Sequence, residues 1–247
     1  MLIACVIPAR LKSTRFPRKM LAPLLGKPLI QWVWEAASRV SLFSELAIAT
    51  DSEELAAIAR GFGAKCYMTS EECATGSDRL IELRKRGSIK ADIWVNWQGD
   101  EPFINARTLT DLLQSCGEDG ADVWTLKKKI TQEEALTPHV CKVVTNSEGF
   151  ALYFSRHPIP FVRDIKPQSS IEFFKHIGMY AYSDAALLKL SSLKPCPLEE
   201  AEQLEQLRFL YNSLSVRVHE TQEEPFGIDL PEHLALAHKK AQELTRC

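Results

Sequence analysis

An α/β fold is predicted for this chain: a Rossmann-like, mostly parallel sheet with helices on both faces and an inserted antiparallel portion. Two observations lead to this prediction. Strand and helix patterns alternate through the first half of the chain, and a hairpin pattern replaces them in the second half. No repeat, low-complexity tract or linker interrupts the 247 residues. We therefore expect a single domain over residues 1–247, with the inserted portion at about 140–220.

In the first half, short apolar runs predict strands and capped segments predict helices. Pro28 can begin a helix, because a proline at an early helical position has no N–H to lose. Asp51 with Glu54 forms a plausible capping box, and Ser77 can cap a third helix. The expected strands lie at 2–7, 46–50, 65–68 and 92–97, and the expected helices at about 28–40, 51–61, 77–86 and 105–116.

The second half changes character. Segments 140–145 and 150–155 flank the turn-forming stretch 146–149, which predicts a hairpin. Segment 173–183 is strand-like, 198–212 is one helix with a single apolar face, and 216–219 is a further short strand. Pro231 begins a last helix that runs to the C-terminus.

Composition excludes several classes of protein. A net charge of −2 creates no overall field that favours nucleic acid or an anionic membrane. The seven cysteines are odd in number and contain no C-x-x-C pair, which argues against a disulfide framework and a structural zinc site. The N-terminal apolar run is too short for a signal peptide, and no segment approaches the length of a membrane span. We expect a cytoplasmic protein without membrane insertion.

Five cations follow the first strand, in the connection where open α/β sheets bind ligands. They are Arg10, Lys12, Arg15, Arg18 and Lys19. Cations crowded in this way repel one another, so we expect an anion such as a triphosphate to relieve them, with Ser13 and Thr14 adding hydroxyl donors. The loop lacks both common glycine-rich phosphate motifs, so side chains must handle the charge. A solvated surface loop is the alternative, although Pro8 and Pro17 stiffen the segment.

A second candidate site is the segment Gln98-Gly-Asp-Glu-Pro102, which follows the strand at 92–97. Its carboxylates, Asp100 and Glu101, fall at the same sheet edge as the basic loop. Mg²⁺ takes one or two protein carboxylates and completes its shell with phosphate oxygens and water. The alternative is that one of these carboxylates caps the next turn.

Asp229 lies between a strand-like run and the helix that begins at Pro231. It could supply a second metal carboxylate. An Asp before a proline-initiated helix is also a common N-cap, and the spacing alone favours that interpretation.

Polar residues scattered through the second half complete the candidates, and their spacing indicates no catalytic triad. His176 sits in an apolar strand, where a lone histidine is more often structural, and Glu205 could simply pair with Arg208 on one helix. The set is Arg156, Arg163, His176, Tyr180, Glu205 and Gln206.

Taken together, these motifs resemble the 3-deoxy-manno-octulosonate cytidylyltransferases, or CMP-Kdo synthetases, a family of sugar nucleotidyltransferases. The resemblance spans essentially the whole chain. The matching segments are Ile7-Pro-Ala-Arg10, Ser13-Thr-Arg15, Gly26-Lys-Pro28, Thr75-Gly-Ser-Asp-Arg79, Val95-Asn-Trp-Gln-Gly-Asp-Glu-Pro102, Ala151-Leu-Tyr-Phe-Ser-Arg156, His176-Ile-Gly-Met-Tyr180, Leu204-Glu-Gln-Leu-Arg208 and Gly227-Ile-Asp229. The chain departs from the family at Arg18 and Met20, where Gly and Pro are usual, and at Thr75, where Ser is usual.

The resemblance implies a homodimeric enzyme that joins CTP to Kdo, with the inserted antiparallel portion at the dimer contact. It implies Mg²⁺ on Asp100 and Asp229, and catalysis by Lys19, Arg10 and the two aspartates. The implied CTP-binding residues are Arg10, Ser13, Lys19, Thr75, Gly76, Ser77 and Arg79. The implied sugar-binding residues are Gln98, Arg156, Arg163, His176, Tyr180, Glu205 and Gln206.

Two alternatives stay open. A related nucleotidyltransferase, such as a CMP-sialic acid synthetase, would share the basic loop but differ at the residues that face the sugar. A non-catalytic nucleotide-binding protein could use the same sheet, although it would not need both Asp100 and Asp229.

Overall fold

A computed structural model describes residues 1–13, 15–163 and 171–246 of the chain. Thr14, one of the expected hydroxyl donors, lies outside the described residues. The chain divides into two compact units, one formed by Met1–Ala106 with Pro225–Cys247 and the other by Arg107–Glu224. The first unit is therefore built from two segments that are distant in sequence.

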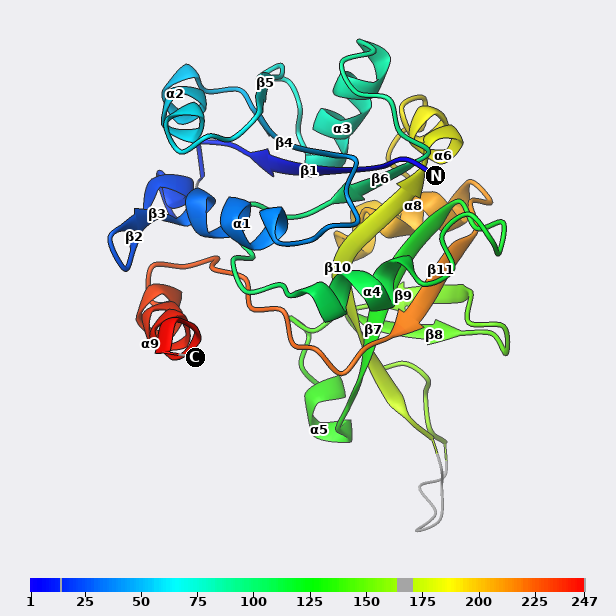
Figure 1. Ribbon diagram of the computed structural model, residues 1–247. Coiled ribbons are helices and arrows are strands. Elements are labelled where there is room, and N and C mark those ends of the chain that lie inside the picture. The colour runs from blue at the N-terminus through cyan, green and yellow to red at the C-terminus, as the bar shows by residue number, and fades with distance from the viewer. Residues whose placement is uncertain (14, 164–170, 247) are drawn as a thin grey trace. The chain divides into compact units, whose positions relative to one another are not determined.

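The first unit contains a parallel sheet in the order β6-β1-β4-β5. All seven residues of β1 are buried, as expected for a parallel strand that helices cover on both faces. Figure 1 shows α1 and α3 on opposite sides of this strand. The strands are β1 (Ile3–Ala9), β4 (Glu45–Thr50), β5 (Cys66–Met68) and β6 (Ile93–Asn96), with a small separate hairpin of β2 (Pro23–Leu24) and β3 (Lys27–Pro28).

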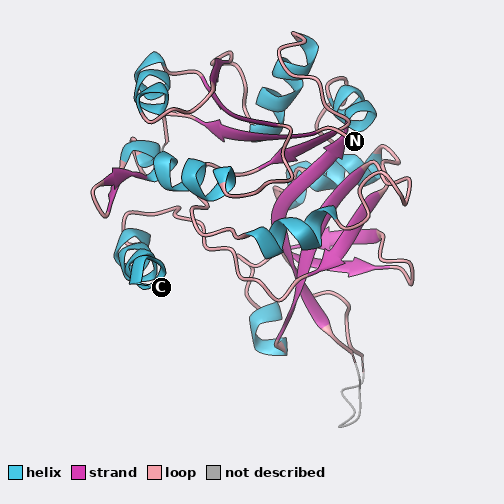
Figure 2. Cartoon of the chain, viewed as in Figure 1, coloured by secondary structure: helices cyan, strands magenta, loops and turns pink. Residues whose placement is uncertain are grey.

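Helices alternate with these strands, as Figure 2 shows by colour, and the predicted α/β class is observed. They are the 3-10 helix η1 (Lys19–Leu21), α1 (Leu29–Ser38), α2 (Glu53–Gly61), α3 (Gly76–Lys85) and α9 (His233–Arg246). Two predicted caps were wrong. Ser52 caps α2 by accepting the N–H of Leu55, because Asp51 is bonded to an arginine instead. Thr75, and not Ser77, caps α3.

The second unit is a mixed sheet in which β7 pairs with β10 antiparallel and with β11 parallel. The predicted hairpin is present, because β8 and β9 pair antiparallel on either side of the turn at 146–149. The strands are β7 (Val123–Ile130), β8 (Lys142–Thr145), β9 (Ala151–Ser155), β10 (Phe173–Ser183) and β11 (Val216–Glu220). The helices are α4 (Ala106–Leu113), α5 (Gln132–Ala135), α6 (Asp184–Leu190), α7 (Pro197–Glu202) and α8 (Gln206–Tyr211).

The single helix expected over 198–212 was wrong, because two short helices, α7 and α8, occupy that segment. Gln203 adopts a left-handed conformation with φ of 53°, which ends α7. An apolar stripe can continue in sequence across such a break, so the pattern alone did not reveal it. Strand β7 also escaped prediction, since three consecutive lysines (Lys127–Lys129) interrupt its apolar run.

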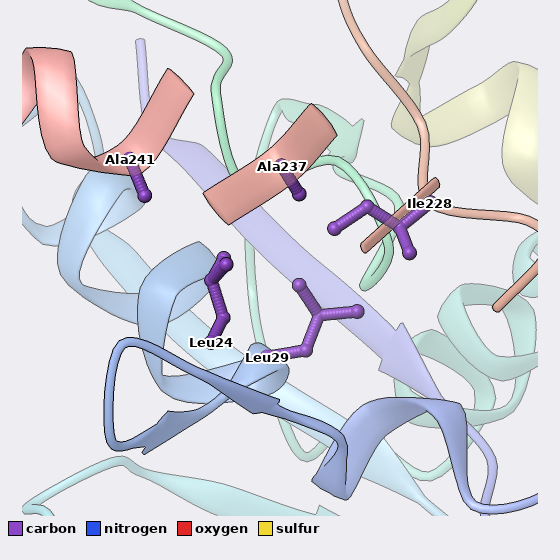
Figure 3. Packing of buried hydrophobic residues seen from close by; sticks show 5 residues of the cluster. All are labelled: Leu24, Leu29, Ile228, Ala237 and Ala241. Atoms are coloured by element: carbon purple, nitrogen blue, oxygen red, sulfur yellow. The ribbon is translucent and has the colours of Figure 1, made fainter. Parts of the chain in front are cut away.

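In the first unit, a hydrophobic cluster packs the N-terminal segment of the unit against its C-terminal segment. Leu24 and Leu29, from β2 and the start of α1, pack against Ile228 and against two alanines of α9 (Figure 3). All five side chains are completely buried. This packing places the segment that carries Asp229 within the first unit.

Candidate active site

The basic loop runs from Arg10, directly after β1, to η1, and it is less exposed at its end than at its start. Lys19 and Met20 are buried, whereas Arg10, Arg15 and Arg18 are exposed. The backbone N–H of Lys19 donates to the Phe16 carbonyl, and Ala22 closes the 3-10 turn by donating to Lys19. The loop therefore carries one lysine inward on a short helical turn.

Four of the five cations of this loop already have a carboxylate partner. Lys12 pairs with Glu71, Arg15 with Asp229, Arg18 with Glu54, and Lys19 with Asp100. The expectation that these cations crowd together without countercharge was therefore wrong for four of them. Their partners come from distant parts of the sequence, which the spacing within the loop cannot reveal.

The loop borders a cavity of about 280 Å³ that lies entirely within the first unit. Its walls come from the end of β1 with the basic loop, the segment leading into α3, the segment after β6 and the segment before α9. The lining residues are Pro8, Ala9, Arg10, Ser13, Arg15, Lys19, Met20, Cys73, Ala74, Thr75, Gly76, Arg79, Gln98, Gly99, Asp100 and Asp229. The cavity thus brings together the predicted phosphate-binding and metal-binding residues.

The N-terminus of α3 opens onto this cavity. Thr75 accepts the N–H of Asp78 at 3.2 Å, and Asp78 accepts the N–H of Thr75 at 2.8 Å, which is a complete capping box. A side chain at Gly76 would place its Cβ 3.0 Å from Pro8 Cγ, so glycine permits the close approach of α3 to β1 without crowding. A helix N-terminus favours negative charge, so this end of α3 suits an anionic ligand.

Arg79 lines the cavity but is 3% exposed, and its guanidinium is already bonded. It donates to Asp51 Oδ2 at 2.7 Å and to the hydroxyl of Thr69. These bonds tie α3 to the ends of β4 and β5. Arg79 therefore braces the cavity wall, and Asp51 is a supporting residue that the sequence analysis considered only as a cap.

The segment after β6 approaches the basic loop closely. A Cβ on Gly99 would lie 2.9 Å from the Pro8 carbonyl and 3.0 Å from Met20 Sδ, so only glycine fits there. Trp97 donates its indole N–H to the Glu101 carbonyl at 3.1 Å, which fixes the turn around Asp100. Gln98 donates to Asn96 Oδ1 at 3.4 Å and also lines the cavity.

Asp100 and Asp229 converge on one ammonium group. Lys19 Nζ donates to Asp100 Oδ2 and lies 3.4 Å from Asp229 Oδ1, and its side chain is only 9% exposed. Arg15 also donates to Asp229 Oδ1, at 3.2 Å. The expectation that Asp229 caps the last helix finds no support in these contacts, because its carboxylate faces the basic loop.

This donor set fits a magnesium ion. Two carboxylates face one cavity, beside cations and a helix N-terminus that suit phosphate. Mg²⁺ is usually held in such sites by one or two carboxylates together with substrate phosphates, and not by a complete protein cage. Within the described ranges, no group of three or more His, Cys, Asp or Glu residues is placed to hold a metal.

Glu101, the other carboxylate of the segment after β6, lies beside these aspartates but in a different environment. Its Oε2 is buried and has no hydrogen-bond partner within the described residues. Burial, and then the neighbouring charges of Asp100 and Asp229, raises the pKa of Glu101 to about 8. The sequence placed this carboxylate at the sheet edge but could not show that it points away from solvent.

Within the second unit, three of the predicted sugar-facing residues lie together around His176. Its ring is 5.5 Å from the Tyr180 ring and 4.9 Å from Phe154. Burial lowers the pKa of His176 to about 3 and raises that of Tyr180 well above its usual value. Both side chains are therefore neutral at pH 7.

Hydrogen bonds identify the tautomer of His176. The Thr125 hydroxyl lies 2.9 Å from the Met179 carbonyl, 3.1 Å from the Ile177 carbonyl and 2.9 Å from His176 Nε2, so with its one proton on a carbonyl it accepts from Nε2–H. His176 Nδ1 is then the acceptor that faces the side-chain amide of Gln206 at 3.4 Å. Thr125 was not predicted, since a threonine inside a strand carries no sequence signal of its own.

The other predicted residues of the second unit are arranged differently. Arg156 Nε donates to the Glu202 carbonyl at 2.8 Å, and the backbone N–H of Arg156 donates to the Glu202 carboxylate. Arg163 is exposed. Glu205 directly precedes α8 as its N-cap residue. Arg208, the expected partner of Glu205, donates from Nε to Glu199 Oε2 at 2.7 Å.

The structural role of Lys142, which is buried, was not predicted. Its ammonium donates to the carbonyls of Thr137, Val140 and Arg156, which connects the segment before β8 to the end of β9. From the sequence alone, a lysine within a strand is expected to lie on the surface. Here three carbonyl oxygens replace its hydration shell.

Comparisons with known proteins agree on one family. A family model described as Cytidylyltransferase matches residues 4–220. A 3-deoxy-manno-octulosonate cytidylyltransferase of Geobacter sulfurreducens is 45% identical over 242 residues, covering 94% of this chain and 96% of the relative. Another, from Acidobacterium capsulatum, is 43% identical over 229 residues and covers 93% of this chain and 92% of its own.

Solved structures extend the similarity to three dimensions. The structure of a CMP:2-keto-3-deoxy-manno-octonic acid synthetase complexed with CTP is 38% identical, with a TM-score of 0.92, and covers 98% of this chain and 100% of that one. A cytidylyltransferase from Leptospira borgpetersenii is 16% identical with a TM-score of 0.65, covering 98% of this chain and 87% of its own, and shares the fold alone. The predicted fold class is confirmed by the first of these.

Proposed function

The chain belongs to the 3-deoxy-manno-octulosonate cytidylyltransferases, and on that premise we propose that it joins CTP to Kdo, releasing pyrophosphate and giving CMP-Kdo for lipopolysaccharide synthesis. One observation supports this proposal most directly. The cavity of the first unit combines a cationic loop, a helix N-terminus and two carboxylates that share one lysine. These groups are what a magnesium-bound nucleoside triphosphate requires.

The reaction is an in-line attack of the anomeric hydroxyl of Kdo on the α-phosphorus of CTP, with pyrophosphate as the leaving group. Arg10, Ser13 and Lys19 bind the triphosphate, and Lys19 and Arg10 stabilise the charge that develops on pyrophosphate. Such transfers depend on positioning and charge neutralisation and need no covalent enzyme intermediate. Asp100 and Asp229 would hold Mg²⁺, which when bound neutralises phosphate charge and polarises the attacking oxygen.

Thr75, Gly76 and Arg79 line one wall of the cavity, and we assign them to CTP binding together with buried Ser77 of α3. The backbone N–H groups at the start of α3 suit a phosphate or ribose oxygen. Arg79 contributes by holding that wall in place, because its guanidinium is bonded to Asp51 and Thr69. Bonds that hold the wall in place lower the entropic cost of binding.

Kdo carries a carboxylate, and its countercharge must come from arginine. His176 is neutral at pH 7 and its two ring nitrogens face Thr125 and Gln206, so it supplies no charge to the sugar carboxylate. Arg156 and Arg163 are the remaining cations among the proposed sugar-binding residues, which include Gln98, Tyr180, Glu205 and Gln206. We assign the sugar carboxylate to these arginines, because charge-assisted hydrogen bonds from guanidinium to carboxylate are strong and directional.

The homodimer and the cytoplasmic location belong to the same proposal. The second unit exposes several large apolar side chains that a partner subunit would cover, namely Leu136, Leu152, Phe161 and Ile171. The six cysteines among the described residues are free thiols, as a reducing compartment favours. The described part of the chain contains no helix long and apolar enough to cross a membrane. Light scattering of the purified protein tests the dimer.

Pyrophosphate release tests the activity. The enzyme is mixed with CTP and Mg²⁺, and Kdo, a sialic acid or no sugar is added. Pyrophosphate release with Kdo, but not with the sialic acid or without sugar, supports the proposal. Preference for the sialic acid would assign the chain to the related synthetases. No release with either sugar, while the protein still binds CTP, would instead favour a non-catalytic nucleotide-binding protein.

A further inference from the structure

Asp229 sits on a segment that the backbone, and not its own side chain, holds in place. Its carboxylate is 45% exposed, and its contacts with Arg15 and Lys19 are 3.2 and 3.4 Å long. Ion pairs this long and this exposed contribute too little energy to fix the position of the carboxylate. Its position must therefore come from the residues on either side.

Ile228 attaches this segment directly to the other proposed metal carboxylate. Its N–H donates to the carbonyl of Asp100 at 2.9 Å. Its side chain is fully buried among Leu24, Leu29 and the alanines of α9, as Figure 3 shows. The residue next to Asp229 is thus fixed to the backbone of Asp100 on one side and to a hydrophobic cluster on the other.

His233 holds Asp229 from its other side. The backbone N–H of Asp229 donates to His233 Nδ1 at 3.2 Å. His233 is the first residue of α9, and its ring lies 6.0 Å from that of Phe226. An aspartate before a helix usually accepts a hydrogen bond from a backbone N–H of the helix. Here the backbone N–H of Asp229 donates instead to a side chain of the helix, His233.

We propose that Ile228 and His233 are positioning residues for the metal site, so that α9 and its cluster set where Asp229 stands relative to Asp100. This inference rests on the proposed metal role of the two aspartates. Outer partners that orient metal ligands commonly change metal affinity by about 10–100-fold when they are removed. Neither Ile228 nor His233 would touch the ion or the substrates.

Binding of Mn²⁺ in the presence of CTP, followed by the electron paramagnetic resonance of free Mn²⁺, tests the inference without turnover. Ile228→Ala and His233→Phe should each weaken Mn²⁺ binding, by about tenfold as expected for an outer partner. Ile228→Val and His233→Asn should restore most of it, because they keep the packing and the acceptor atom. Unfolding midpoints are measured in parallel.

A matched control separates the loss of metal positioning from general destabilisation of the fold. Ile48→Ala removes the same atoms from a fully buried isoleucine in β4, and it should destabilise the protein while leaving Mn²⁺ affinity unchanged. Equal loss of affinity in Ile48→Ala and Ile228→Ala would overturn the inference. If Ile228→Ala does not fold, His233→Phe decides, and wild-type affinity in that variant would also overturn it.

Asp229→Asn distinguishes this inference from the function on which it rests. If Asp229→Asn loses Mn²⁺ and the Ile228 and His233 variants do not, the positioning role is wrong and the metal site stands. If Asp229→Asn binds Mn²⁺ as tightly as the wild type, the proposed metal role of Asp229 is itself wrong.

Discussion

Lys19 and Asp100 form an ion pair in which the lysine is almost completely buried, and the same ammonium group faces Asp229. Three charged groups from three distant segments thus meet at one point of the cavity. Removing Lys19 takes the ammonium partner of Asp100 away in a site that is only partly open to water, whereas Asp229 keeps its contact with Arg15. This dependence makes the site sensitive to single substitutions.

Asp100→Asn should reduce turnover by about 10²–10³-fold, as is typical when one preorganised electrostatic contact to the transition state is lost. The substitution keeps the shape of the side chain, so the fold should survive. Pyrophosphate release under saturating CTP and Kdo measures the effect. Turnover close to that of the wild type would contradict the metal role assigned to Asp100.

Lys19→Met should damage the use of CTP more than the binding of Kdo, because Lys19 is assigned to the triphosphate. The methionine keeps much of the volume of the buried side chain but removes its charge. Titration calorimetry with CTP and Mg²⁺, and separately with Kdo, measures the two affinities. Lys12→Met is the matched control, since Lys12 is exposed and pairs only with Glu71. Unchanged CTP binding and normal turnover in Lys19→Met would count against the assignment.

Arg18 adopts a left-handed conformation, with φ of 58°, directly before η1. Glycine tolerates this conformation without strain, whereas a β-branched residue does not. The chain keeps an arginine here, and its guanidinium makes two hydrogen bonds to Glu54 in α2. Arg18→Gly should therefore stay close to the wild type in stability, because relief of strain offsets the lost ion pair.

Arg18→Val should be clearly less stable than Arg18→Gly, because valine loses the ion pair and keeps the strain. Urea unfolding midpoints of the three proteins give the order. If Arg18→Val unfolds at the same urea concentration as Arg18→Gly, the left-handed conformation carries no strain and the argument is wrong.

Much of the sheet could be predicted from sequence, because buried strands such as β1 and β4 contain continuous apolar runs. Caps were harder. The observed caps, Ser52 and Thr75, lie within two residues of the predicted caps, Asp51 and Ser77, and Asp51 is bonded to a tertiary partner, Arg79. Local spacing contains no information about such partners.

The candidate site divides in the same way. Arg10, Asp100 and Asp229 stand at strand ends or helix starts, so the topology of an α/β sheet locates them in advance. The neutral state of His176, the buried carboxyl of Glu101 and the bond from Asp229 to His233 depend on burial and on side-chain direction. These features exist only once the chain has folded.

Because His176 is buried in its neutral form, the free energy of unfolding should decrease as the pH falls. The pKa of His176 is lowered to about 3 in the folded protein, against its ordinary value of about 6.5 in an unfolded chain. Between these two values the unfolded chain binds the extra proton, so the free energy of unfolding rises with pH in this window. The stabilisation is complete above about pH 6.5 and is lost as the pH falls towards 3, by up to about 1.4 kcal/mol per pH unit.

His176→Gln should flatten this dependence, because glutamine does not titrate. Urea unfolding at pH 7, 6, 5 and 4 gives the slope for each protein, and His139→Gln, at an exposed position, is the control. Some slope should remain in His176→Gln, since burial also lowers the pKa of His219. If the wild type and His176→Gln lose stability in parallel as the pH falls, His176 is not buried in its neutral form, and the hydrogen-bonding role assigned to it with Thr125 and Gln206 fails as well.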